Sequence, residues 1–235
     1  MSETLDDLVK RADPDRWLAS RFIGDTAARA DVVALYALNH ELARVASSVR
    51  EPLMGEIRLT WWREAFEEII AGKPPRKHPV VEAAAAAAIP NAALGTLPEG
   101  RFAELDAGPL EEDALFAYLD RTAGAVMTLA AQRLDPEAHL EQVRGAARAF
   151  GLAGLWRAKK AGRRSRLPED WGPGDVRARV RAELTAARSE LGSLPVGAFP
   201  AVAYAALARP YAAGGEPGAL GKRLRLMVAV ARGRI

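Results

Sequence analysis

Residues 31–70 read DVVALYALNHELARVASSVREPLMGEIRLTWWREAFEEII, and this stretch decides the fold. In its first half, apolar residues recur at steps of three or four, which predicts a long, half-buried amphipathic helix containing Val32, Leu35, Leu38, Leu42, Val45 and Val49. In its second half, Pro52 suits the first turn of another helix, and Gly72 with Pro74 closes it. One apolar row of this second helix is formed by Leu53, Ile57, Trp61, Ala65 and Ile69. Another row is formed by Leu59, Trp62 and Phe66. Because it is apolar on two faces, we expect this helix inside a large bundle.

Helical signals continue on both sides of this stretch, and no convincing strand is found. Asp13-Pro14 and Asp25-Thr26 are typical helix starts, while proline- or glycine-rich segments at 73–79, 90–109 and 171–174 separate helices. Periodicity predicts further helices over 116–134, from Pro136 towards Lys160, over 176–191, around 199–208 and over 218–232. We therefore expect an all-α fold, with residues 1–235 forming one domain.

Composition limits the classes of protein. With 235 residues and 49% hydrophobic content, the chain can bury a sizeable core. It has no cysteine, and its three histidines are too far apart in sequence to suggest a zinc motif, so we expect no metal. The longest uncharged apolar run, residues 199–208, is too short to span a bilayer, and the N-terminus is charged without an apolar core. We expect no transmembrane segment and a cytoplasmic protein, soluble or peripheral at the inner face of the membrane.

Several short motifs resemble the squalene/phytoene synthase family. They are the run Ala34 to Leu38 with Glu41, and Arg58-Leu59 followed by Trp62-Arg63-Glu64. Weaker matches follow in family order up to residue 168: Tyr118, Ala123-Gly124, Phe150-Gly151, Ala153 and Arg166-Leu167-Pro168. The resemblance implies a single-domain helical bundle of the isoprenoid synthase type.

The acidic residues that this family's chemistry needs are missing. Its enzymes hold Mg²⁺ against a substrate diphosphate with aspartates spaced i, i+4, a spacing that places carboxylates on one helix face. The first cluster would fall at Ala43, Arg44 and Ser47, and the second belongs between Gly151 and Pro168, where there is no Asp or Glu. The resemblance therefore implies a member without catalytic residues, metal or cofactor.

Within the superfamily, the sequence is more similar to the group that includes the mitochondrial complex I assembly factor. That group carries a similar run to Asn39, Glu41, Leu42, Ala43 and Val45, followed by Ser48 and Val49. The resemblance implies an assembly or scaffold role, with subunits or assembly intermediates of respiratory complex I as partners. It also implies a retained groove, for a lipid-like ligand or a protein segment, near Tyr36, Asn39, His40, Arg44, Arg58, Trp62 and Arg63. A satisfied buried histidine is the favoured interpretation of His40, and core packing is the favoured interpretation of Tyr36, Trp61 and Trp62.

Six cations lie within ten residues, where the second acidic cluster belongs: Arg157, Lys159, Lys160, Arg163, Arg164 and Arg166. They are interpreted either as a solvated helix end or as a site for an anionic lipid or an isoprenoid diphosphate, since guanidinium groups pair well with phosphate. Nucleic acid is disfavoured because no aromatic residue is interleaved with them.

Two further functions stay open. One is a divergent prenyl-diphosphate transferase that would use Mg²⁺ with Glu64, Glu68 or other carboxylates, since Glu64/Glu68 and Glu137/Glu141 have the i, i+4 spacing. The other is a peripheral module for anionic lipid, which would need the basic run exposed on one flat face. We favour the non-catalytic assembly factor.

Overall fold

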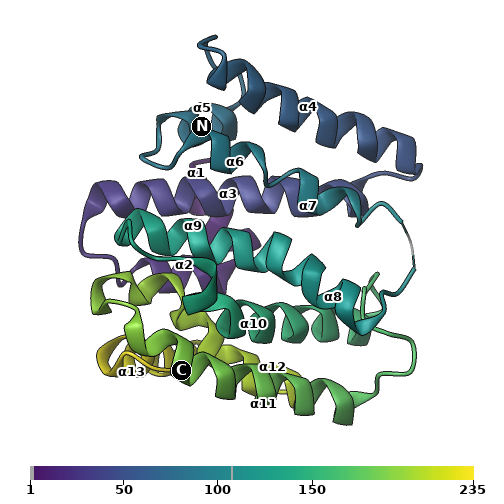
Figure 1. Cartoon of the computed structure of the whole chain (residues 1–235), viewed down its shortest axis with the longest axis vertical. Helices are drawn as coiled ribbons and strands as arrows, with labels where there is room; N and C mark the ends of the chain where they lie inside the picture. Colours follow the sequence, from purple (N-terminus) through teal and green to yellow (C-terminus); the bar gives the residue numbers. More distant parts are fainter. Residues whose placement is uncertain (1–2, 107) are drawn as a thin grey trace. The chain divides into compact units, whose positions relative to one another are not determined.

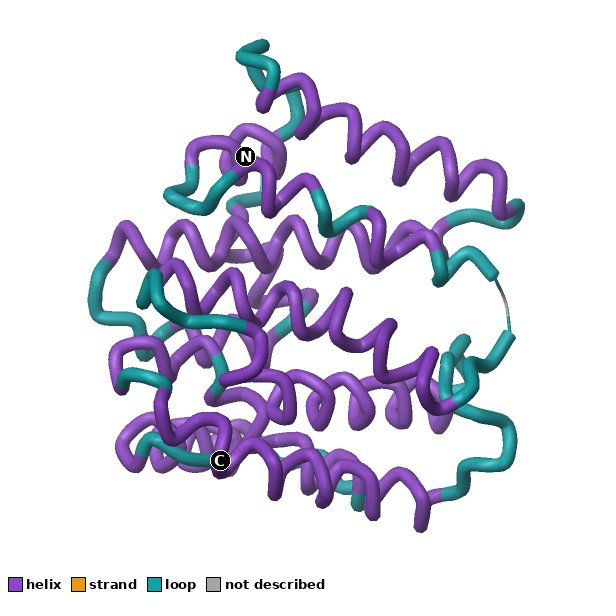
Figure 2. Tube along the Cα trace, viewed as in Figure 1, coloured by secondary structure: helices purple, strands orange, loops and turns teal. Residues whose placement is uncertain are grey.

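The structure is a computed structural model that describes residues 3–106 and 108–235. In these ranges the secondary structure is helical, and Figure 2 shows helices joined by loops without any strand. The all-α fold class predicted from the sequence is therefore confirmed. The chain divides into two compact units, one up to Asp106 and one that follows it. The expectation of one domain over residues 1–235 stays a prediction.

The first unit contains seven helices in its described part (Figure 1). They are α1 (Leu5–Ala12), α2 (Pro14–Ser20), α3 (Thr26–Ser48), α4 (Pro52–Ile70), α5 (Pro79–Ala86), α6 (Asn91–Gly95) and α7 (Glu99–Phe102). Asp13 and Asp25 cap α2 and α3 as expected, because each side chain accepts a hydrogen bond from a backbone N–H of the first turn.

Helix α3 is the core of this unit and packs against α1, α2, α4, α5 and α7. Its predicted apolar stripe is buried from Val32 to Val45, but burial in the middle of the helix is not confined to that stripe. Over residues 32–39 every side chain is buried, including those of Tyr36 and Asn39. Neighbouring helices cover α3 from several sides, which a single amphipathic stripe does not predict.

Helix α4 differs from its prediction. Only the row containing Leu59, Trp62 and Phe66 is buried, together with Gly55 and Ala65. In the other row, Leu53 and Ile57 are 60% and 53% exposed. The expectation that α4 lies inside a bundle was wrong, because its partners α3, α5, α6 and α7 cover one side of it. Apolar side chains at the start of α4 therefore face solvent.

The second unit begins with three consecutive helical segments: α8 (Glu112–Leu119), the π-helical turn η1 (Asp120–Gly124) and α9 (Ala125–Leu134). It continues with α10 (Leu140–Lys160), α11 (Pro173–Glu190), the 3₁₀ segments η2 (Leu191–Ser193), η3 (Val196–Ala201) and η4 (Ala203–Leu207), then α12 (Ala208–Ala212) and α13 (Ala219–Arg232). The α10 helix starts four residues later than predicted, after a turn at Asp135, and it packs along α11 (Figure 1).

The apolar run 199–208 is almost entirely buried, but most of it is not α-helical as predicted. Residues 196–207 form the two short 3₁₀ segments, and α-helix resumes only at Ala208. Pro200 has no N–H to donate to an α-helical hydrogen bond, which favours the shorter repeat. Helix α13 packs against both of these segments.

Candidate functional site

A pocket of about 270 Å³ lies in the first unit between α3, α4 and the start of α5. Helix α3 contributes residues spaced i, i+3, i+4 and i+7, which share one face of a helix: Glu41, Arg44, Val45 and Ser48. Helix α4 contributes Arg58, Trp61 and Trp62, and the loop before α5 contributes His78. Of the groove residues expected from the sequence, the structure brings Arg44, Arg58 and Trp62 together here.

Arg76 holds one wall of this pocket. Its Nε donates to Glu68 Oε2 at 2.8 Å and its Nη2 donates to Glu68 Oε1 at 3.0 Å and to Glu64 Oε2 at 3.1 Å. Its Nη1 also donates to the carbonyl oxygen of Trp61. These bonds fasten the loop 73–78 to α4 and place the His78 ring 5.0 Å from that of Trp62. The aromatic wall of the pocket therefore depends on an arginine outside it.

The charge of the pocket favours anions over metal cations. Arg44 Nη1 lies 3.2 Å from Glu41 Oε1, and Arg58 Nη1 donates to Ser48 Oγ at 2.8 Å. The lining thus carries two guanidinium groups and one carboxylate, and that carboxylate already pairs with Arg44. Divalent cations such as Mg²⁺ prefer several oxygen ligands with negative charge, which this lining does not offer.

The other expected groove residues lie elsewhere in this unit. Tyr36 is buried, with the Arg16 guanidinium 5.8 Å from its ring centre. Asn39 accepts a hydrogen bond from Arg101 at 2.6 Å, and Arg63 pairs with Glu99 at 3.3 Å. Burial lowers the pKa of His40, which also interacts electrostatically with Glu41 and Arg44 of its own helix and with Asp13 and Arg11. None of these four lines the pocket.

Three of the four carboxylates considered for Mg²⁺ already contact basic side chains. Glu64 and Glu68 both bind Arg76, and this hydrogen bonding lowers the pKa of Glu68. Glu141 lies 3.1 Å from Arg144 Nη2 and 3.1 Å from His139 Nδ1. Within the described ranges, no group of three or more His, Asp or Glu side chains could hold a metal ion.

The six cations of residues 157–166 do not share one environment. Arg157 pairs with Glu216 at 3.0 Å and lies 4.2 Å from the Tyr211 ring centre. Lys159 and Lys160 donate to backbone carbonyl oxygens, with Lys159 Nζ 3.1 Å from that of Trp171. Arg166 is buried, whereas Arg163 and Arg164 are exposed after the end of α10. Of this basic run, Arg157 and Lys160 line a shallow pocket of about 300 Å³.

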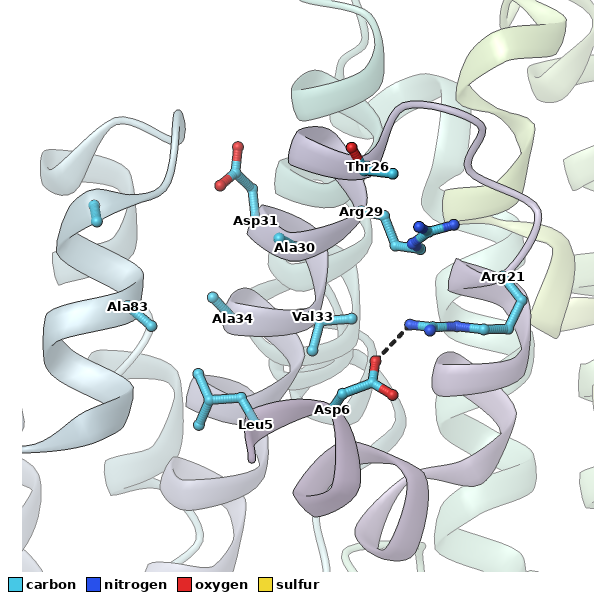
Figure 3. A pocket seen from close by; sticks show the side chains of 11 residues that line it. Leu5, Asp6, Arg21, Thr26, Arg29, Ala30, Asp31, Val33, Ala34 and Ala83 are labelled. Atoms are coloured by element: carbon cyan, nitrogen blue, oxygen red, sulfur yellow. Dashed lines mark hydrogen bonds and ion pairs between the residues drawn. The ribbon is translucent and has the colours of Figure 1, made fainter. Parts of the chain in front are cut away.

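A larger pocket of about 430 Å³ lies between α1, α3 and α5 (Figure 3). Small or apolar residues such as Leu5, Val33 and Ala83 form much of its lining. The Arg21 side chain points towards Asp6, and Nη2 lies 2.7 Å from Oδ1 (Figure 3). This ion pair joins α1 to the end of α2, so its role is to hold these two helices together.

Sequence reasoning missed Arg76 and His78 as parts of the site. Arg76 follows two prolines in a segment that predicts only a chain break, and its partners lie 8 and 12 residues away on another element. His78 precedes Pro79 and caps α5, with Nδ1 accepting from the N–H of Val80 at 3.3 Å. The position of His78 immediately before Pro79, where it caps α5, was the only local feature of the sequence that could have indicated its role.

Comparisons with solved structures agree with this fold. A dehydrosqualene synthase superposes with a TM-score of 0.76 at 14% sequence identity, covering 97% of this chain and 94% of that one. A squalene synthase from Alicyclobacillus acidocaldarius superposes with a TM-score of 0.65, also at 14% identity, covering 97% of this chain and 92% of that one. The architecture is therefore that of the squalene synthase type of helical bundle.

The sequence comparison identifies the family. A sequence model of squalene/phytoene synthase matches residues 9–232, so the chain belongs to the squalene/phytoene synthase family, as its motifs indicated.

Among curated proteins, the chain is similar to NADH dehydrogenase (ubiquinone) complex I, assembly factor 6. It is 33% identical to the human protein over 76 residues and 29% identical to the bovine protein over 76 residues. This match covers 32% of this chain and 22% of each relative. Along the described residues, no helix is long and apolar enough to cross a membrane.

Proposed function

We propose that this protein is a non-catalytic member of the squalene/phytoene synthase family and acts as an assembly or scaffold factor for respiratory complex I. The observation that carries this proposal is the charge of the pocket between α3 and α4. Where the first acidic cluster of an enzyme would be expected, Arg44 lies in the pocket, facing Arg58 and paired with Glu41. The relatives named as complex I assembly factor 6 support the choice of partner.

The start of α4 offers a surface for such a partner. Leu53, Met54 and Ile57 lie within one turn and a half of the helix, and each is exposed by 46% or more. Contiguous exposed apolar side chains are typical of protein–protein contacts. This surface adjoins the pocket, because Ile57 lies one helical turn before Trp61, which lines the pocket.

The first test is complementation in the native host. Loss of the protein is expected to lower NADH:quinone oxidoreductase activity of the membranes, with succinate oxidation unchanged. The double variant Leu53→Ser with Ile57→Ser is expected to restore less activity than the natural chain. Val196→Ser is the matched control, because Val196 is 67% exposed in the second unit. Unchanged oxidoreductase activity after loss of the protein would contradict the proposed role.

The fold similarity to dehydrosqualene and squalene synthases favours a second candidate, a divergent prenyl-diphosphate transferase. Incubation of the purified chain with labelled farnesyl or geranylgeranyl diphosphate and Mg²⁺ separates the two. We expect no diphosphate release above a blank without protein, since Glu64 and Glu68 are paired with Arg76. Clear release would contradict the non-catalytic interpretation, and its loss in Glu68→Gln would identify the relocated carboxylates.

A further inference from the structure

Helix α13 carries a row of large apolar side chains that face solvent. Leu220, Leu224 and Met227 are 81%, 57% and 51% exposed, and their i, i+4, i+7 spacing places them on one face. The opposite face is buried through Leu226 and Ala229, where α13 packs on η3 and η4. The exposed row is therefore a second apolar face of α13, which the core of the unit does not cover.

Cations border this row on both sides. At 100° per residue, Arg223 lies next to the row on one side, and Arg225 and Arg232 lie further round the helix on the other side. Residues 217–235 contain five Lys or Arg residues and no Asp or Glu. This end of the chain is therefore amphipathic and strongly basic.

A groove of about 510 Å³ runs beside the row, formed by α11, η4, α12, α13 and the residues after α13. It gathers four arginines: Arg188, Arg209, Arg225 and Arg234. Among the described residues, none of their side chains has an acidic partner. Leu224 and Val228 add apolar surface to the same groove. Four guanidinium groups with an apolar wall suit a phosphate group that is attached to an apolar body.

We infer that α13 binds the surface of an anionic phospholipid bilayer. The helix lies in the plane of the membrane, with Leu220, Leu224 and Met227 entering the boundary between head groups and acyl chains. The flanking arginines contact lipid phosphates, and the groove receives one head group. An acidic protein would complement the charge alone, whereas a bilayer complements both the charge and the apolar row. The inference concerns α11–α13 and is independent of the proposed function.

Co-sedimentation with lipid vesicles tests this inference on the full chain. We expect binding to vesicles of phosphatidylglycerol mixed with phosphatidylcholine and little binding to phosphatidylcholine alone, with the affinity falling as salt rises. Arg225→Gln with Arg234→Gln is expected to weaken binding by about thirtyfold, from the usual gain per cation at an anionic surface. Both side chains are exposed, so the fold should tolerate the change. The matched control is Arg50→Gln with Arg121→Gln, which removes the same charge from two exposed positions outside α11–α13 and outside the basic run of residues 157–166.

Insertion of the apolar row is tested by labelling, because the chain has no cysteine and one introduced cysteine is a unique site. A polarity-sensitive dye at Met227→Cys is expected to shift to the blue on anionic vesicles, while the same dye at the exposed position Arg50→Cys does not. Equal binding to both kinds of vesicle, or an equal loss in the two arginine pairs, would overturn the inference. So would binding of glycerol phosphate or of polyglutamate without binding of vesicles, since the site would then take a soluble anion or an acidic protein.

Discussion

Gly145 is the position at which the close packing of α10 against α11 can be tested most sharply. A Cβ at this position would lie 2.6 Å from the carbonyl oxygen of Glu183 and 2.9 Å from the backbone nitrogen of Ala187. Both atoms belong to the backbone of α11, so no side chain can rotate away to make room. The Gly145 N–H also donates to Glu190 Oε2 at 2.7 Å. Gly145→Ala must therefore push α10 and α11 apart.

The expected magnitude follows from three contributions. Overpacking of a core costs about 1–3 kcal/mol. Lengthening the bond to the Glu190 carboxylate adds part of the roughly 1.5–3 kcal/mol that such charged hydrogen bonds contribute. Alanine recovers about 1 kcal/mol of helix propensity over glycine. The net loss is about 2 kcal/mol of unfolding free energy, which for a chain of this size lowers the melting temperature by about 4–8 °C.

Gly154 provides the matched control on the same helix, because a Cβ at Gly154 would meet no atom within 4 Å. Gly154→Ala should stabilise the chain by up to about 1 kcal/mol through helix propensity and the unfolded state. The stability of both variants would be measured by thermal and urea unfolding, followed by far-ultraviolet circular dichroism. If Gly145→Ala is as stable as Gly154→Ala, the close contact between α10 and α11 is wrong.

Three further predictions concern titration and metal. Burial raises the pKa of Glu183 above its ordinary value of 4.5, so ionising this carboxyl in the folded chain costs stability as the pH rises from 4.5 through the raised pKa. Glu183→Gln should therefore raise the melting temperature near neutral pH but not below pH 4.5. Burial lowers the pKa of His40, so stability should fall as the pH drops below 6.5, and His40→Gln should flatten this pH dependence of the melting temperature. Millimolar Mg²⁺ should leave the melting temperature unchanged, because a ligand of the folded state must raise it; a reproducible rise would reveal carboxylates that bind metal.

Much of the fold could be predicted because it depends on local sequence. The caps at Asp13 and Asp25, the start of α4 at Pro52 and the stripe of α3 are short-range features, and the structure has them where expected. The 3₁₀ segments of residues 196–207 were missed, since a buried apolar run is compatible with several helical repeats. The break at η1 likewise has no strong local signal, because its five residues continue the surrounding helical pattern.

The candidate site was predictable only in part, since it joins residues that are distant in sequence. The motif positions located Arg44, Arg58 and Trp62, which do line one pocket. They could not show that Asn39 faces Arg101, 62 residues further along the chain. The basic run of residues 157–166 looked uniform as a sequence, yet its members differ in the structure because each finds a different carbonyl, carboxylate or solvent environment.

The sequence by itself determined that this chain is all-helical, that it belongs to the squalene/phytoene synthase family and that the positions expected for its acidic clusters carry no carboxylate. Periodicity is sufficient for the fold class, because it depends on spacing along one helix. The family and the missing carboxylates follow from short motifs in their order along the chain. Only the tertiary structure decided which apolar row of α4 is covered, that Arg76 neutralises Glu64 and Glu68, and that α13 leaves Leu220, Leu224 and Met227 in solvent. Burial and ion pairing depend on which elements pack together, and a helix's own pattern of residues does not specify its neighbours.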